Sequence, residues 1–509
     1  MKISRARVIV ALAATVVLAS SARVPARSSD GQTRNGPGDA AGFHLSIYHP
    51  MKGSGDGSNP VAPVIKASDG NFYGTTTAGG SANLGTVFRM TPAGVTTVVH
   101  SFTGADGSLP RGALLQAGDG NLYGTTYTGG ASNLGTVFKM TLAGTFTTIY
   151  SFVGGTTDGA SPRAALIQAS NGNLYGTTEF GGTANRGSAF GMTLAGSVTV
   201  RYFFSGGDDG AYPYAPLIQA TDGNLYGTAY AGDVATFGRV FQMTPAGAVT
   251  VLHTFVSGAT DGASPLTALI QATDGNFYGT THLGGTTDSG TVFKITLAGV
   301  VTLLKVFTGG ADGANPDGTL VQGADGNLYG TTRVGASGYG TAFRLALDGT
   351  GFTVIHTFTG ASDGADPSAG LLQTSDGNFW GTAEFGGAAG LGLVFRMTTA
   401  AATPFTDDTL TVGTTPIRAV HITELRSRVD ALRTRFGLSA FAYTDPTLTV
   451  GMTMVAAAHI NDLRNALGQA YDAVGVGRPN YADATLDVGV MAIKAVHITE
   501  LRAAVQNIE

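Results

Sequence analysis

Residues 121–126 read Asn-Leu-Tyr-Gly-Thr-Thr, and close copies of this stretch return along most of the chain. The glycine of the copies lies at Gly74, Gly124, Gly176, Gly227, Gly279, Gly330 and Gly381. Neighbouring copies are 50 to 52 residues apart. A period of this length, with several short strands in each unit, is typical of a β-propeller. The stretch therefore predicts seven repeats of one structural unit.

The second unit shows what each repeat contains. Residues 113–117 (ALLQA) are short and apolar, and after a Gly-Asp-Gly turn residues 121–126 (NLYGTT) have an extended pattern. Residues 136–141 (TVFKMT) and 145–152 (TFTTIYSF) are rich in β-branched and aromatic side chains, which favour strands. Four short strands with short connections predict one antiparallel propeller blade.

The two ends of the repeat region fit together. Residues 43–48 (FHLSIY) resemble the fourth strand of a unit, whereas the seventh unit stops after its third strand at residues 393–398. The N-terminus would therefore supply the missing strand, which leaves no open sheet edge. The sequence predicts an all-β fold for residues 43–399, a seven-bladed β-propeller closed by its N-terminal strand.

This closure predicts where each part of a blade lies. The N-terminal strand would be outermost, so residues 113–117 and their equivalents would line the central channel. The Asp-Gly-Asn turns would lie on one face, which we call the turn face. The Asp-Gly-X-X-Pro connections and the Gly-Gly loops would lie on the other, which we call the long-loop face.

Composition excludes several classes of function. The 509 residues contain no cysteine, which excludes disulfides, thiol catalysis and cysteine-bound metals. The net charge is −5 and no block of Lys and Arg occurs, so nucleic acid is not an expected partner. No nucleotide-binding, zinc-protease or serine-hydrolase motif is found, and no cofactor is expected.

The N-terminus predicts export. Lys2, Arg5 and Arg7 precede an apolar run at residues 8–19 and then small residues. This pattern indicates a signal peptide at residues 1–26, because roughly 12 apolar residues are too few to span a bilayer. Residues 27–42 read as a flexible lead-in. We expect an exported protein, extracellular or at the cell surface, with no transmembrane segment after cleavage.

Most repeated side chains have a structural interpretation. An aromatic residue recurs on the second strand at Tyr73, Tyr123, Tyr175, Tyr226, Tyr278, Tyr329 and Trp380. Sugar stacking is one interpretation, but recurrence in every blade favours packing between blades.

The loop aspartates are Asp56, Asp106, Asp158, Asp209, Asp261, Asp312 and Asp363. Each loop offers too few oxygens for calcium, so turn formation is the preferred role.

Function is expected where the repeats differ on the long-loop face. The residue after the second strand reads Thr77, Tyr127, Glu179, Tyr230, His282, Arg333 and Glu384. The residue after the loop proline reads Val61, Arg111, Arg163, Tyr214, Leu266, Asp317 and Ser368. The candidate binding residues are Tyr127, Glu179, Tyr230, His282, Arg333, Glu384, Arg111, Arg163, Tyr214 and Asp317. They could bind a polar ligand, and two carboxylates could act as acid and base. The alternative is a tolerant surface.

The last hundred residues have a different repeat of 38 residues. Residues 417–426 (IRAVHITELR), 455–464 (VAAAHINDLR) and 493–502 (IKAVHITELR) each follow an extended lead-in and have helical apolar spacing. A small α-rich domain of three repeats is expected at 404–509. His421, His459 and His497 could form a zinc site. A repeated contact at each helix start explains them more simply.

The propeller repeat resembles the GloVer tandem repeat of bacterial "choice-of-anchor" proteins. Residues 110–140 carry it almost unbroken as PRGALLQAGDGNLYGTTYTGGASNLGTVFKM. The resemblance implies an exported or surface protein and supplies no catalytic residues. A fainter similarity to virginiamycin B lyase-type propellers supports seven blades. The C-terminal segment resembles HITELR-type repeats of exported proteins, which implies attachment to an envelope component.

The sequence leaves three functions to be tested. The leading one is a non-enzymatic binding scaffold, with a glycan or protein ligand on the long-loop face and an envelope partner at the C-terminal domain. The alternative is a propeller enzyme, a lyase or glycoside hydrolase acting on an extracellular polysaccharide. A purely structural surface protein is the third.

Overall fold

The computed structural model describes residues 43–398 except 54 and 233–236, and then residues 405, 417–436, 438–448, 455–474, 478–483, 486 and 493–508. The expected signal peptide and lead-in, residues 1–42, lie outside the described residues. Among the described residues, no helix is long and apolar enough to cross a membrane.

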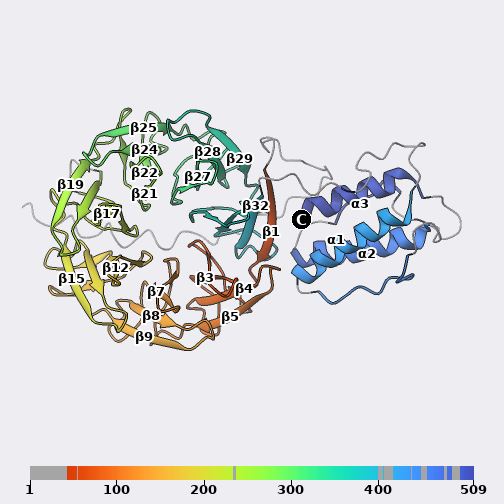
Figure 1. Ribbon diagram of the computed structural model, residues 1–509, viewed down its shortest axis with the longest axis horizontal. Coiled ribbons are helices and arrows are strands. Elements are labelled where there is room, and N and C mark those ends of the chain that lie inside the picture. The colour runs from red at the N-terminus through yellow and green to blue at the C-terminus, as the bar shows by residue number, and fades with distance from the viewer. Residues whose placement is uncertain are drawn as a thin grey trace, which may run out of the picture. The chain divides into compact units, whose positions relative to one another are not determined.

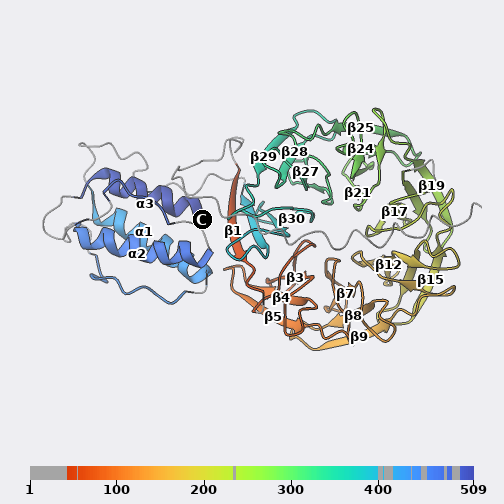
Figure 2. The same ribbon diagram turned by 180° about the vertical axis from the view of Figure 1, so that it is seen from behind.

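Residues 43–398 form a seven-bladed propeller, as predicted. Figures 1 and 2 show its four-stranded sheets around a ring. The first three blades are β2 (Ile65–Lys66), β3 (Phe72–Thr76), β4 (Thr86–Met90), β5 (Thr96–Ser101); β6 (Leu115–Gln116), β7 (Leu122–Thr126), β8 (Thr136–Met140), β9 (Phe146–Ser151); and β11 (Ile167–Gln168), β12 (Leu174–Thr178), β14 (Ser188–Met192), β15 (Val198–Phe203). The next three are β16 (Ile218–Gln219), β17 (Leu225–Ala229), β18 (Arg239–Met243), β19 (Val249–Thr254); β21 (Ile270–Gln271), β22 (Phe277–Thr281), β24 (Thr291–Ile295), β25 (Val301–Val306); and β26 (Val321–Gln322), β27 (Leu328–Thr332), β28 (Thr341–Leu345), β29 (Thr353–Thr357).

The seventh blade closes the ring with a strand from the N-terminus. Its strands are β30 (Leu372–Gln373), β31 (Phe379–Ala383), β32 (Leu393–Thr398) and β1 (His44–Pro50). β1 pairs antiparallel with β32, so that Ile47 lies opposite Phe395, and it is outermost in this blade (Figure 2). The predicted closure is confirmed. Two small ribbons, β10 (Gly159–Ala160) with β13 (Phe180–Gly181) and β20 (Gly262–Ala263) with β23 (Leu283–Gly284), join loops of the long-loop face.

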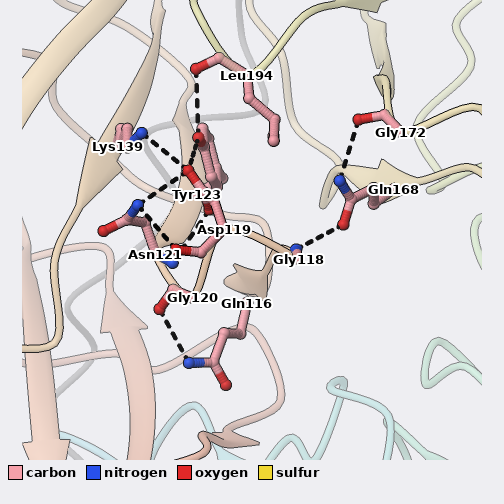
Figure 3. Close-up of polar contacts among 10 residues, drawn as sticks. All are labelled: Gln116, Gly118, Asp119, Gly120, Asn121, Tyr123, Lys139, Gln168, Gly172 and Leu194. Carbon is pink, nitrogen blue, oxygen red and sulfur yellow. Dashed lines mark hydrogen bonds and ion pairs between the residues drawn. The ribbon is translucent and has the colours of Figure 1, made fainter.

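The innermost strand is shorter than the five residues expected, because only two of them pair with the second strand. Its glutamine connects the blades instead. Gln168 Oε1 accepts a hydrogen bond of 2.7 Å from Gly118 N of the preceding blade, and its Nε2 donates to the Gly172 carbonyl (Figure 3). The same bridge is made by Gln116, Gln219, Gln271, Gln322 and Gln373. Lys66 takes this place in the first blade.

The turn face repeats one hydrogen-bonded motif. Asp119 accepts from the backbone N of Asn121 at 3.1 Å, from the Tyr123 hydroxyl at 2.9 Å and from Lys139 Nζ at 2.9 Å (Figure 3). The Tyr123 hydroxyl also lies 3.3 Å from the Leu194 carbonyl of the next blade. Tyr123 is fully buried, so the packing role predicted for the repeated aromatics is confirmed.

The glycine of the repeated stretch is required by packing within its own blade. A Cβ atom on Gly124 would lie 2.4 Å from Phe138 Cζ and 3.0 Å from Leu114 Cδ2, and both residues belong to the same blade. The missing side chain therefore makes room for the phenylalanine ring of the neighbouring strand.

The loop aspartates act within turns. Asp106 accepts from the Thr103 backbone N at 2.8 Å and lies 2.8 Å from His100 Nε2 on the fourth strand. Equivalent pairs are His49–Asp56, Tyr150–Asp158, Tyr202–Asp209, His253–Asp261, Lys305–Asp312 and His356–Asp363. His49 has this place in the seventh blade, because it lies opposite Val394 just as His100 lies opposite Val87.

The C-terminal domain contains α1 (Ala419–Arg435), α2 (Ala457–Val474) and α3 (Ala495–Ile508), and each helix packs against the other two. His459 Nδ1 accepts from the Ala456 backbone N at 3.1 Å, and its Nε2 lies 2.6 Å from Asp445 Oδ2. His421 and His497 make the same contact at their helix starts. The helix-start interpretation of the three histidines is confirmed, and the described residues contain no cluster of metal-ligand side chains.

Candidate functional site

The two variable columns are held together by the backbone of every blade. The N–H of Tyr127, just after β7, donates to the Leu109 carbonyl at 3.1 Å, and Glu384 donates in the same way to Asp366. The accepting residue precedes the loop proline and has a φ of 54° to 58° in all seven blades, at Asn59, Leu109, Ser161, Tyr212, Ser264, Asn315 and Asp366. This left-handed conformation is uncommon for residues other than glycine. This conformation places the residue after the proline beside the end of the second strand.

Blades two to four contribute arginines stacked on tyrosines. The Arg111 guanidinium lies 5.0 Å from the centre of the Tyr127 ring, and that of Arg163 lies 4.9 Å from the Tyr214 ring. The Tyr214 and Tyr230 rings are 5.0 Å apart. Among the described residues, neither arginine has an ion-pair partner, and Arg111 Nε is buried without a hydrogen bond. These stacked cations remain available to a ligand.

Glu179 is the carboxylate of this half of the site. It is buried, and its Oε1 accepts a hydrogen bond of 3.4 Å from the Tyr214 hydroxyl. Burial raises the pKa of Glu179, while the charges of Arg163 and Arg111 act in the opposite direction. Burial and the charge of Glu179 also raise the pKa of Tyr127. The phenols therefore remain neutral hydrogen-bond donors near neutral pH.

Blades five to seven contribute two tight pairs. His282 Nδ1 lies 2.6 Å from Asp317 Oδ1, and Arg333 Nε donates to Asp366 Oδ2 at 2.8 Å. Asp366 is buried, its Oδ1 has no hydrogen bond, and burial raises its pKa. The Asn315 amide donates to the His282 carbonyl at 2.9 Å.

Glu384 connects the two halves. Burial and then the charge of Asp366 raise the pKa of Glu384 to about 7, and the charges of Arg333, Arg111 and Arg163 oppose that shift. Arginines from blades two and three therefore lie close enough to act on a carboxyl group of blade seven. We call the combined set the polar cluster: Arg111, Tyr127, Arg163, Glu179, Tyr214, Tyr230, His282, Asp317, Arg333, Asp366 and Glu384.

All ten predicted site residues lie in the polar cluster, and the first blade adds no charge to it. Thr77 there donates to the Asn59 carbonyl at 3.1 Å. Asp366 lies outside the two variable columns, in the position directly before the loop proline, and was not predicted. That column changes from blade to blade as the other two do, and it contains Asp366 and Asn315.

Comparison with known proteins identifies the repeat. The model of the Gloeobacter/Verrucomicrobia repeat matches residues 38–236, 144–337 and 215–420. No curated protein sequence matches the chain.

Some solved structures have a weak similarity to this chain. A proposed 6-phosphogluconolactonase from Bacteroides uniformis is 15% identical, with a TM-score of 0.42, over 60% of this chain and 85% of that one. A protein of unknown function from Dyadobacter fermentans is 11% identical, with a TM-score of 0.38, over 70% and 99%. At these scores the likenesses carry no argument about activity.

Proposed function

Because the chain belongs to the Gloeobacter/Verrucomicrobia repeat family and its repeats close into a propeller, we propose that it is an exported scaffold that binds a glycan through the polar cluster. Export would follow from residues 1–26. The C-terminal domain would dock the chain to an envelope component, and envelope fractionation of a chain that ends at residue 403 tests this part.

The main support for ligand binding is a pair of arginines that have no ion-pair partner among the described residues. Arg111 and Arg163 are stacked on tyrosine rings and lie near the carboxyl groups of Glu179 and Glu384. Aromatic faces beside fixed donors and acceptors suit the apolar and hydroxyl faces of a sugar. Stacking holds each guanidinium in place, so little side-chain entropy is lost on binding.

We expect Arg163→Ala to weaken glycan binding about tenfold, which corresponds to about 1.4 kcal/mol. The side chain would no longer offer hydrogen bonds to the ligand or hold the Tyr214 ring. Glycan-array screening followed by titration of the best ligand measures the change. Lys66→Ala, at an exposed residue near the turn face, is the matched control and should bind as the native protein does. Equal losses in both variants, or no loss in either, would contradict the proposal.

Glu384 favours an enzyme as the second candidate, because a carboxyl group with a pKa of about 7 can serve as a general acid near neutral pH. A lyase or glycoside hydrolase using it would be active while Glu384 is protonated, so its rate would fall as the pH rises through about 7. A screen for polysaccharide degradation by the native protein and by Glu384→Gln tests this role. It covers roughly pH 5 to 9, a range that lies on both sides of this pKa. Turnover that Glu384→Gln retains would exclude this role.

A further inference from the structure

Two arginines of the polar cluster have no hydrogen-bond acceptor within the chain. Arg111 and Arg163 are half-buried, and neither guanidinium forms a hydrogen bond or an ion pair with the described residues. In the same cluster, by contrast, Arg333 Nε donates to Asp366 Oδ2 at 2.8 Å. A guanidinium stays charged and carries five N–H donors, and donors that are withdrawn from water without an acceptor are unfavourable. A ligand that supplies acceptors at this place therefore gains binding energy.

These two guanidiniums also lie within range of each other's charge. Burial lowers the pKa of Arg111, and the positive charge of Arg163 lowers it further. Each guanidinium is held by an aromatic ring: Arg111 lies 5.0 Å from the centre of the Tyr127 ring, and Arg163 lies 4.9 Å from that of Tyr214. Two like charges at fixed positions repel each other, and an anion between them reverses the sign of that energy.

The nearby carboxyl groups of the cluster do not take the place of such an anion. Glu179 Oε1 accepts a hydrogen bond from the Tyr214 hydroxyl, and among the described residues Glu179 forms no ion pair. Burial and then the charge of Asp366 raise the pKa of Glu384 to about 7, so this group carries only part of a negative charge near neutral pH. The two arginines can therefore accept a further negative charge.

The fold of a blade does not require an arginine at this position. Val61, Leu266 and Ser368 occupy the same place in other blades, which form the same four-stranded sheets. Arginine occurs there only in the second and third blades, which are neighbours in the ring. Because packing does not explain Arg111 and Arg163, a binding role explains them better.

We propose that Arg111 and Arg163 together bind an anionic group of the glycan, a carboxylate or a sulfate ester, so that the ligand of the polar cluster is an acidic polysaccharide. A guanidinium can donate two parallel N–H bonds to such a group, and these charge-assisted bonds are stronger than neutral ones. The Tyr127 and Tyr214 rings keep the guanidiniums in position, which reduces the entropy lost on binding. This inference rests on the proposed glycan binding and narrows its ligand to an acidic one.

A glycan array of matched pairs tests the inference. Each uronic-acid glycan is printed beside its methyl ester, and each sulfated glycan beside its desulfated form, so that the members of a pair differ in charge. We expect the strongest ligand to be acidic and to bind roughly tenfold more tightly than its neutral partner. A preference among the uronates assigns the anionic group as a carboxylate, and one among the sulfated glycans assigns it as a sulfate.

Titration calorimetry of the selected pair locates the contact. Arg111→Gln and Arg163→Gln should each weaken binding of the acidic member roughly tenfold and that of the neutral member less than about threefold. Arg163→Lys keeps the charge but loses the paired donors, so its affinity should lie between those of the native protein and Arg163→Gln. Arg89→Gln is the matched control, because Arg89 acts on Asp69 at the turn face, and it should bind both members as the native protein does.

Three results would overturn the inference. They are a neutral glycan as the strongest ligand, a preference for the acidic member that both glutamine variants retain, or an unchanged affinity with a lower Tm, which would make the arginines structural. The first result leaves the proposed function intact, because the propeller would still bind a glycan. If the native protein binds none of the printed glycans, the proposed function itself is wrong, and the inference falls with it.

Discussion

A chain that begins at residue 52, and so lacks β1, is expected to lose its cooperative thermal transition. Ile47, Tyr48 and Met51 are all buried, and Tyr48 packs edge-on against Trp380 with ring centres 4.4 Å apart. At about 2 kcal/mol for each buried side chain, their loss removes about 6 kcal/mol, which is comparable to the whole stability of many proteins. Scanning calorimetry and size-exclusion chromatography measure the effect.

The matched control begins at residue 43 and should melt like the full chain, because it keeps every strand of the ring. The shorter chain also exposes the edge of β32, so it should associate through that edge. A synthetic peptide of residues 43–51, added in excess, should restore the monomer and raise the Tm. A monomeric short chain with an unchanged Tm would contradict the closure as the source of stability.

The ring closure was predictable because it depends on counting. Residues 43–48 match a fourth strand and residues 393–398 end a third one, so only one arrangement leaves no open edge. The bridges between blades were not predictable in the same way. A glutamine equivalent to Gln168 recurs in most repeats, just as the packing residues do. Only the distance from Gln168 to Gly118 shows that its side-chain amide bonds to a neighbouring blade.

Ten of the eleven residues of the polar cluster lie in the two variable columns of the sequence, but their contacts could not be predicted. Variation along two columns identified Glu179 and Glu384, which lie in different blades. Both carboxyl groups interact with Arg111 and Arg163, because the closed ring gathers the strand ends of different blades around its centre. Repeat spacing alone does not fix such distances. Asp366 could not be predicted in this way, because turn formation alone explains an aspartate directly before the loop proline.

The fourth blade contains a buried arginine where most other blades have a hydroxyl pair. Thr126 and Thr136 face each other across the second and third strands, with their hydroxyls 2.7 Å apart. Equivalent pairs are Thr76–Thr86, Thr178–Ser188, Thr281–Thr291 and Thr332–Thr341. In the fourth blade Ala229 lies opposite Arg239, whose Nε donates to the Asp208 carbonyl at 2.9 Å. The small alanine makes room for the long side chain.

We expect Arg239→Thr alone to destabilise the protein by about 3 kcal/mol, because it leaves a cavity and buried carbonyls without donors. Ala229→Thr alone should cost about 2 kcal/mol, because the added atoms crowd Arg239. The double variant should lie within about 1 kcal/mol of the native protein, because two threonines can form the hydroxyl pair of the other blades. Denaturant unfolding of all four proteins measures this cycle.

The interaction energy between positions 229 and 239, obtained from this cycle, decides the question. If the losses simply add, the double variant will be the least stable of the four, and the alanine does not compensate for the arginine. If the double variant recovers, one blade can be returned to the common pattern by two changes. Because Arg239 also bonds to the carbonyls of Gly207 and Gly238, the loop before the fourth blade should then become more mobile, and faster hydrogen exchange at residues 205–210 would detect it.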